Sequence, residues 1–391
     1  MAVLNRRTTT TTIGLAALLL GAAPAEAQER RNVDFYQGPV ISSLRAVGLG
    51  GALTGVAEGA DSHLINPASF AVRSSHAADD WFDWDVTLST FILDARSDTD
   101  IDLSGRSGFD SAEYGQLGFN LKFGHHGFGL QARGHTYRLQ SGTDRSVTYA
   151  QTLGGVGYAY ALGDGGLTFG GMLTFGNARM TEGPDTLLEI EGSGVQLGAL
   201  WSPCGRPFRL GGSFRSEILA FSPDEETVTF QGDEIAYQLV IPAQLSVGYS
   251  YMLGPRPYNV CPTFGNRELH FPKRHLPRFY VLLTGDLVFT GPVENGTGAQ
   301  AFLAGEEQRS GEDASASFRG GVESEVMDNR LVLRAGTYLE PSRFDAEDGR
   351  LHLTGGFDVR IFKWLLDWEL CGAFDFAERY TNIGLGVGVW H

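Results

Sequence analysis

The stretch RFYVLLTGDLVFTG, residues 278–291, alternates apolar side chains with polar or small ones. One face of the extended chain is apolar and carries Phe279, Val281, Leu283, Leu287 and Phe289. The opposite face carries Thr284 and Asp286. A hydrophobic period of two residues predicts a β-strand that contacts an apolar medium on one side only.

The same period recurs in GQLGFNLKFG (115–124), RLHLTGGFDVRI (350–361) and TNIGLGVGVWH (381–391). It predicts about 14 strands, an even number, and many are about 10 to 13 residues long, which suits a tilted membrane crossing. We expect them near 84–94, 114–124, 127–138, 147–162, 166–178, 187–201, 208–221, 236–253, 277–290, 315–326, 330–340, 350–361, 364–374 and 381–390. The predicted fold class is an all-β transmembrane antiparallel barrel.

The links between these strands alternate in length. Short links such as 125–127 and 163–165 alternate with long acidic ones such as 94–113, 222–234 and 291–313. Bacterial outer-membrane barrels have short periplasmic turns and longer outer loops. If the first strand rises from the periplasm, every short link is periplasmic and every long acidic loop lies outside.

One link departs from this rule. Residues 254–277 form a long, basic, proline-rich segment on the expected periplasmic side, so either a strand pair is miscounted or the barrel has an unusual periplasmic loop. Cys204, in a turn, falls on the same side as Cys261 in this segment. An oxidising periplasm would allow a disulfide between them, and the alternative is two free thiols.

The N-terminal sequence and the net charge indicate the cellular compartment and limit the possible functions of the protein. Arg6 and Arg7, an apolar run at 13–23 and the sequence Ala25-Glu26-Ala27 predict a signal peptide over residues 1–27. A net charge of −16 argues against nucleic-acid partners. There is no Gly-x-Ser-x-Gly sequence and no spacing typical of metal ligands, so we expect no enzyme activity, no metal and no cofactor.

A second segment, RAVGLGGALTGVAEGADSHLINPASFA (45–71), is rich in glycine and alanine. It lacks the lysine of a phosphate loop, and Asp61 excludes a bilayer span. Glycines at 51, 55 and 59 would form a smooth ridge on a helix. Asn66 can cap a helical turn that has Pro67 at its first position. Because a barrel of about 14 strands has a lumen wider than its side chains fill, we expect residues 28–80 to plug it.

Residues 48–71, followed by these strands, resemble the N-terminus of the FadL family of outer-membrane transporters, which includes toluene-transport relatives. The matching positions are Gly48, Gly50, Gly51, Asp61, Asn66, Pro67 and Ala68. The resemblance implies a monomeric barrel (81–391) in the bacterial outer membrane, surrounded by lipid and lipopolysaccharide. It also implies an N-terminal hatch (28–80) in which these seven residues serve gating. PorV-like barrels share the motif.

Two functions follow from the resemblance. The first is passive uptake of long-chain fatty acids or other hydrophobic small molecules, with Phe302 and Leu303 in an outer loop as candidate capture residues. That loop tip could instead pack on its neighbours. The second is a PorV-like assembly or secretion accessory barrel without small-molecule transport, docking through the basic residues 273–275. Charged lumen residues, among them Arg133, Asp286, Arg334 and Asp358, are expected mainly to form ion pairs that brace the barrel.

Overall fold

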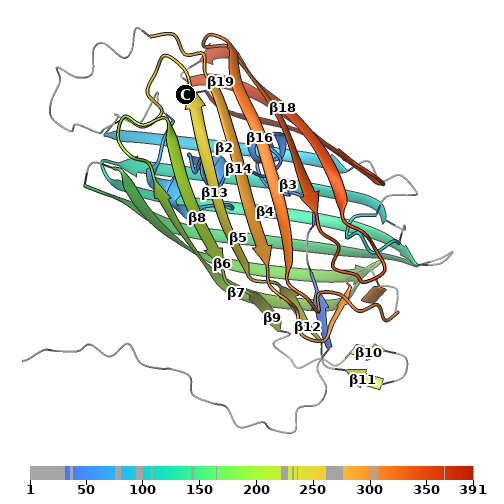
Figure 1. The fold of residues 1–391 in the computed structure, drawn as a ribbon. Helices are drawn as coiled ribbons and strands as arrows, with labels where there is room; N and C mark the ends of the chain where they lie inside the picture. The colour runs from blue at the N-terminus through green and yellow to red at the C-terminus, as the bar shows by residue number, and fades with distance from the viewer. Residues whose placement is uncertain are drawn as a thin grey trace, which may run out of the picture.

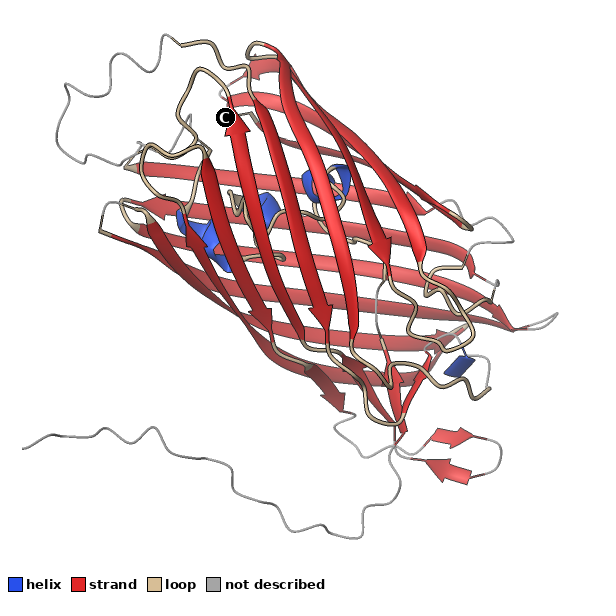
Figure 2. Cartoon of the chain, viewed as in Figure 1, coloured by secondary structure: helices blue, strands red, loops and turns tan. Residues whose placement is uncertain are grey.

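The computed structural model describes residues 31–35, 38–74, 81–93, 100–106, 109–141, 145–163, 165–221, 228–230, 233–235, 237–260, 276–298, 301–302, 306–364 and 366–390. These residues form a closed antiparallel barrel of 14 strands with short helical segments inside it (Figures 1 and 2). The predicted fold class and strand number are confirmed.

The strands follow one another around the barrel in chain order. They are β2 (Phe82–Leu93), β3 (Phe109–Phe123), β4 (His126–Ser141), β5 (Arg145–Leu162), β6 (Leu167–Glu182), β7 (Asp185–Trp201), β8 (Phe208–Arg215) with β9 (Ile218–Phe221), β12 (Tyr237–Ile241) with β13 (Gln244–Leu253), β14 (Val281–Thr290), β16 (Ser315–Met327), β17 (Leu331–Glu340), β18 (Arg350–Trp364), β19 (Leu366–Ala377) and β20 (Tyr380–Val389). The barrel closes where β20 pairs with β2, from Thr87 opposite Gly388 to Leu93 opposite Asn382.

Two neighbouring strands of the wall are interrupted at the same height. Ser216 and Glu217 separate β8 from β9, and Pro242 and Ala243 separate β12 from β13. Pro242 has no amide hydrogen to give to a ladder, which explains why a break is tolerated there. The sequence predicted each pair as one continuous strand, and the structure shows a local discontinuity in the wall.

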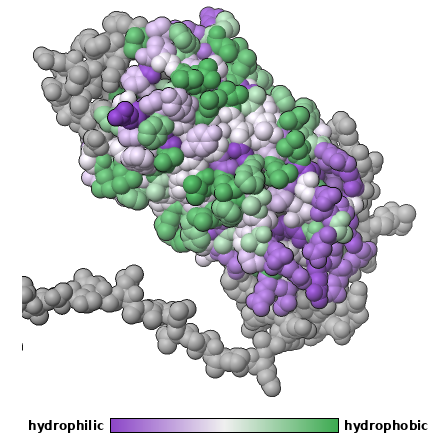
Figure 3. Space-filling view, viewed as in Figure 1, coloured by the Kyte–Doolittle hydropathy of each residue, from purple (hydrophilic) through white to green (hydrophobic). Residues whose placement is uncertain are grey.

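The outside of the barrel is apolar along its strands. On β14 the outward side chains of Val281, Leu283 and Phe289 are 38–43% exposed, whereas Leu282 and Thr284 point inward and are buried. Figure 3 shows hydrophobic side chains gathered over the strands and hydrophilic ones gathered at one end. Such an apolar band, alternating with a polar lumen, is the surface of a transmembrane barrel. Among the described helices, none has the length and hydrophobicity to cross a membrane.

The two ends of the barrel differ. The short-turn end carries the links at 124–125, 163–166, 202–207 and 328–330, and the other end carries the long loops, including a hairpin of β10 (Val228–Phe230) and β11 (Asp233–Ile235). This long-loop end also carries tight turns at 183–184 and 378–379, so the expectation that every short link is periplasmic is wrong. The segment between β13 and β14 belongs to the short-turn end, because the strands on both sides of it are confirmed. No strand pair was miscounted, and this long link is unusual.

The N-terminal segment enters the lumen at the long-loop end and leaves it at the short-turn end. At the long-loop end, β1 (Arg31–Asp34) pairs in parallel with β12 and with β15 (Gly296–Gly298). Inside follow α1 (Leu44–Gly48) and two 3-10 helices, η1 (Ala60–Ser62) and η2 (Pro67–Ala71). We call residues 38–74 the hatch; the expected limits at 28–30 and 75–80 fall outside the described residues.

One local expectation about the hatch is wrong. The glycines at 51, 55 and 59 do not form a helical ridge, because α1 ends at Gly48. Gly50 and Gly51 have φ of 62° and 79°, a left-handed conformation that side chains with a Cβ rarely adopt. The chain therefore turns away from the helix immediately, and the later glycines lie in irregular backbone.

Candidate functional site: the lumen and its hatch

Inward-facing glycines of the wall form the seat of the hatch. A Cβ added at Gly170 would overlap the carbonyl of Pro67, and one at Gly211 would overlap that of Thr54. Gly198 faces the side chain of Asn66 in the same way. Because these contacts involve hatch backbone, the wall and hatch approach more closely than any other residue type would allow. This close fit explains why glycine occupies so many inward positions of the strands.

Asn66 performs the predicted capping and more. Its Oδ1 accepts from the amide of Ala68 at 3.1 Å, with Pro67 at the first position of η2. Its Nδ2 donates to the carbonyl of Thr54 at 2.9 Å and to that of Ala199, in β7, at 3.1 Å. Asn66 therefore joins two parts of the hatch to each other and to the wall.

We expect Asn66→Ala to lower the free energy of unfolding by about 2–4 kcal/mol, since a cap is lost and two buried carbonyls lose their donor. Denaturant unfolding of the purified barrel, followed by circular dichroism, measures this. Asn177→Ala is the matched control, because among the described residues the Asn177 side chain makes only a long contact of 3.4 Å with Glu189 at the surface. Equal stabilities of both variants and the wild type would contradict the role of Asn66.

Charged residues join the hatch to the wall in what we call the clamp: Arg45, Glu58, Arg209, Glu323 and Arg334. Arg45 donates to both carboxylate oxygens of Glu323 at 2.8 Å, and Arg334 donates to Glu323 at 2.6 Å. Glu58 accepts from Arg209 at 2.7 Å and pairs with Arg45 at 3.2 Å. Arg334 also pairs with Asp358 on β18. The expectation that Arg334 and Asp358 form bracing ion pairs is confirmed.

Asp61 and His63 of the hatch are shielded from water, which disfavours their charged forms. Burial raises the pKa of Asp61 to about 6, and the nearby Asp85 carboxylate adds to the shift. Burial lowers the pKa of His63 to about 3, so its imidazole is neutral near pH 7. The carboxylate of Asp85 accepts from the amide of Ala60 at 2.7 Å, which holds η1 against β2.

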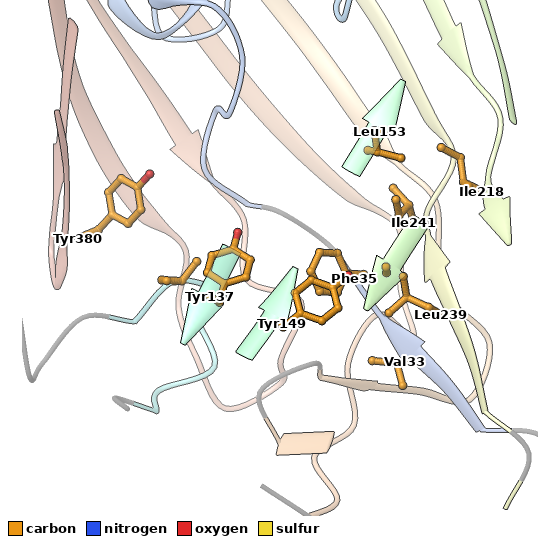
Figure 4. Packing of buried hydrophobic residues seen from close by; sticks show 11 residues of the cluster. Val33, Phe35, Tyr137, Tyr149, Leu153, Ile218, Leu239, Ile241 and Tyr380 are labelled. Atoms are coloured by element: carbon orange, nitrogen blue, oxygen red, sulfur yellow. The ribbon is translucent and has the colours of Figure 1, made fainter. Parts of the chain in front are cut away.

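On the long-loop side of the hatch, apolar side chains fill the lumen. Figure 4 shows this cluster, which we call the aromatic cluster. Its members are Val33, Phe35, Ile101, Tyr137, Tyr149, Leu153, Ala178, Ile218, Leu239, Ile241 and Tyr380. The ring centroids of Phe35 and Tyr149 are 4.8 Å apart. Phe35 reaches the cluster because β1 docks at the barrel mouth, a placement that no sequence pattern indicated.

A cavity of about 80 Å³ lies between this cluster and the hatch. Its accessible surface is more polar than apolar, because three arginines line it together with apolar side chains, and we call it the arginine cavity; it is lined by Phe35, Pro39, Val40, Ile41, Ser42, Leu64, Ile65, Arg133, Arg215, Ile241, Pro242, Gln244 and Arg319. Arg133 contacts the carbonyl of Ile41 at 3.4 Å, and Arg319 contacts the hydroxyl of Ser317 at 3.5 Å. Within the described part of the chain, neither forms an ion pair with a carboxylate. Arg133 therefore does not brace the barrel as expected.

The remaining predicted site residues lie apart. Phe302 is partly buried and packs against the aromatic cluster, whereas Leu303 is outside the described residues. Cys204 is exposed in a short turn and is disulfide-bonded. Cys261 is also outside the described residues, so the predicted pairing of the two stays a prediction. Cys371 is a free thiol.

Comparison with known proteins adds to this geometry. No protein-family profile and no curated protein matches the sequence. Several solved structures match the fold. A FadL homologue of Pseudomonas aeruginosa is 12% identical, with 90% of this chain and 98% of that chain covered and a TM-score of 0.54. The toluene transporter TodX of Pseudomonas putida is 14% identical, with coverages of 92% and 98% and a TM-score of 0.53.

The chain has the fold of the FadL-type channels. The toluene transporter TbuX of Ralstonia pickettii shares this FadL-type fold, at 12% identity, coverages of 91% and 98% and a TM-score of 0.50. Together with the apolar band around its strands, the closed FadL-type barrel places this protein in the bacterial outer membrane. By the same principle the short-turn end is periplasmic and the long-loop end external.

Proposed function

We propose that this protein is a passive uptake channel for long-chain fatty acids or similar amphiphilic carboxylates. The observation that carries the proposal is the arginine cavity. Arg133 and Arg319 offer donors suited to a carboxylate, whereas the adjoining aromatic cluster offers apolar contacts to the alkyl chain, which a cavity of about 80 Å³ does not hold. A neutral hydrocarbon would gain nothing from these charges. The FadL-type fold and the transporters that share it support the same general activity.

The proposed route begins at the external end. A hydrophobic molecule meets Phe302 and the aromatic cluster, and its carboxylate reaches the arginine cavity. Passage straight through the hatch is opposed by the glycine seat and the clamp. Pro242 lines the cavity and also lies at the break between β12 and β13. We therefore propose that the molecule leaves sideways through the wall near Pro242 and Ser216.

Combined substitution of Arg133→Gln and Arg319→Gln tests this function. We expect uptake of labelled oleate by cells that lack other fatty-acid channels to fall about tenfold or more, since each charged hydrogen bond is worth about 1.5–3 kcal/mol. Uptake of toluene, which has no charge, should stay unchanged. The control is Arg309→Gln, because the Arg309 side chain is 79% exposed and belongs to a surface pair. Unchanged oleate uptake in the double variant would refute the proposal.

The accessory-barrel alternative stays a prediction, because its expected docking residues, 273–275, fall outside the described residues. It requires a stable complex with another envelope protein and wild-type fatty-acid uptake in cells without this protein. Affinity purification from native membranes, together with the uptake assay above, separates the two functions. The expected monomeric state is tested in the same preparation by native mass spectrometry.

A further inference from the structure

A second cavity, of about 60 Å³, lies on the periplasmic side of the hatch. We call it the basic cavity, since it contains four basic side chains and, among its described lining residues, no aspartate or glutamate. It lies where the hatch meets the start of the periplasmic links, and it is lined by Ala71, Val72, Arg73, Lys122, Gly124, His125, Ala161, Gly165, Thr168, Ser202, Arg209, Tyr258, Asn259 and Val260. In a chain of net charge −16, such a lining is unusual.

Several of its polar groups are deeply buried. Arg73 and Lys122 are each 4% exposed, and Thr168 is fully buried. Within the described residues, the hydroxyl of Thr168 and Nη2 of Arg73 have no hydrogen-bond partner. The other side of the Arg73 guanidinium pairs with Asp83 at 2.7 Å. A buried donor without an acceptor costs about 1–3 kcal/mol, which a bound oxyanion would recover.

The neighbouring cavity is net acidic. It measures about 140 Å³, and its lining includes seven carboxylates, among them Asp61, Asp85, Asp358 and Glu369, and four arginines. An anion in this region of the lumen is therefore repelled on one side and attracted by the basic cavity on the other. Arg73 lines both cavities, at the boundary between them.

We propose that the basic cavity binds a small oxyanion, the carboxylate head group of an amphiphile on the periplasmic side of the hatch. At about 60 Å³ the cavity has room for about four water-sized groups, enough for a carboxylate but not for an alkyl chain. Because the proposed route leaves the lumen on the external side of the hatch, this carboxylate comes from an amphiphile in the periplasm, and the site does not depend on the proposed function. The lumen then has one cationic site on each side of the hatch, the arginine cavity and the basic cavity.

Calorimetric titration of the purified full chain in detergent, with octanoate and separately with inorganic phosphate, tests this site. We expect two octanoate sites in the wild type and loss of one in Lys122→Met. Because Lys122→Met could also disturb folding, Thr168→Val provides a nearly isosteric second variant. It should weaken one octanoate site about 3–10-fold, the effect of one hydrogen bond.

Thr174→Val is the matched control. Thr174 lies on the same face of β6 and is also buried, and among the described residues its hydroxyl also lacks a partner, but it does not line the cavity. Wild-type octanoate binding in both Lys122→Met and Thr168→Val would overturn the proposal, and so would a cavity that binds phosphate but not octanoate. Octanoate binding that is sensitive to Thr168→Val in a protein that transports no fatty acid would support this site and refute the proposed function.

Discussion

Glu323→Gln is expected to lower the free energy of unfolding by about 3–5 kcal/mol, because it removes the carboxylate from a buried ion-pair network. Glu323 is 1% exposed and accepts from Arg45 and Arg334, and also from the hydroxyl of Tyr280 at 2.7 Å. Glutamine can accept fewer of these hydrogen bonds. It also leaves the two guanidinium groups close together without the negative charge that offsets their repulsion. Heat or denaturant unfolding of the folded barrel, read by its gel mobility, measures the loss.

Glu312→Gln is the control for this variant. Glu312 forms an ion pair with Arg309 at 3.0 Å, but both side chains are more than half exposed, where such a pair contributes little. We expect no measurable change in its unfolding. If Glu323→Gln unfolded at the same denaturant concentration as Glu312→Gln, the clamp would not contribute to stability, and the hatch would depend on its glycine seat alone.

Gly170→Ala is expected to displace η2 from the wall and to open an ion-conducting path through the lumen. The added methyl group overlaps the carbonyl of Pro67 and approaches the amide of Ala68, and both are backbone atoms that cannot rotate away. Overpacking of this kind costs about 1–3 kcal/mol, and a shift of the hatch relieves it. Planar-bilayer recordings should show conductance steps that the wild type lacks.

Gly154→Ala is the matched control on the adjacent strand β5. A Cβ at Gly154 meets nothing nearer than the carbonyl of Gln131 at 3.8 Å, an ordinary contact. It should therefore behave like the wild type in the same recordings. Wild-type conductance in Gly170→Ala would show that the hatch tolerates the displacement without opening, and that the seat does not form the seal.

The two structural predictions and the transport proposal concern different parts of the lumen. The clamp and η2 both lie toward the periplasmic end, on different strands of the wall, whereas the arginine cavity lies on the external side. A variant that loosens the hatch without changing Arg133 or Arg319 should raise conductance while oleate selectivity persists. Measuring both properties on the same variants separates sealing of the lumen from recognition of the molecule.

The alternation of apolar and polar residues in stretches such as 278–291 determined the fold class, because side chains of a strand that separates lipid from a lumen must alternate. The same pattern predicted the strand number, and link lengths predicted which end carries the long loops. The sequence Asn66-Pro67 also predicted the capped helical turn that it forms, since helix capping depends on residues that are close in sequence. Even the wrong expectation, a helical ridge of glycines, failed for a local reason: Gly50 and Gly51 adopt left-handed conformations that end α1.

What only the tertiary structure decided is how distant segments meet. The clamp joins Arg45 to Glu323, the arginine cavity joins residue 41 to Arg133 and Arg319, and the basic cavity joins Arg73 to Lys122 and Thr168. No local pattern relates these positions. They meet because the barrel closes between its first and last strands and because the hatch passes through the lumen beside particular inward-facing residues. The sequence by itself determined a barrel with a plugged lumen. The closing of the barrel around the hatch decided which charged side chains lie together in it.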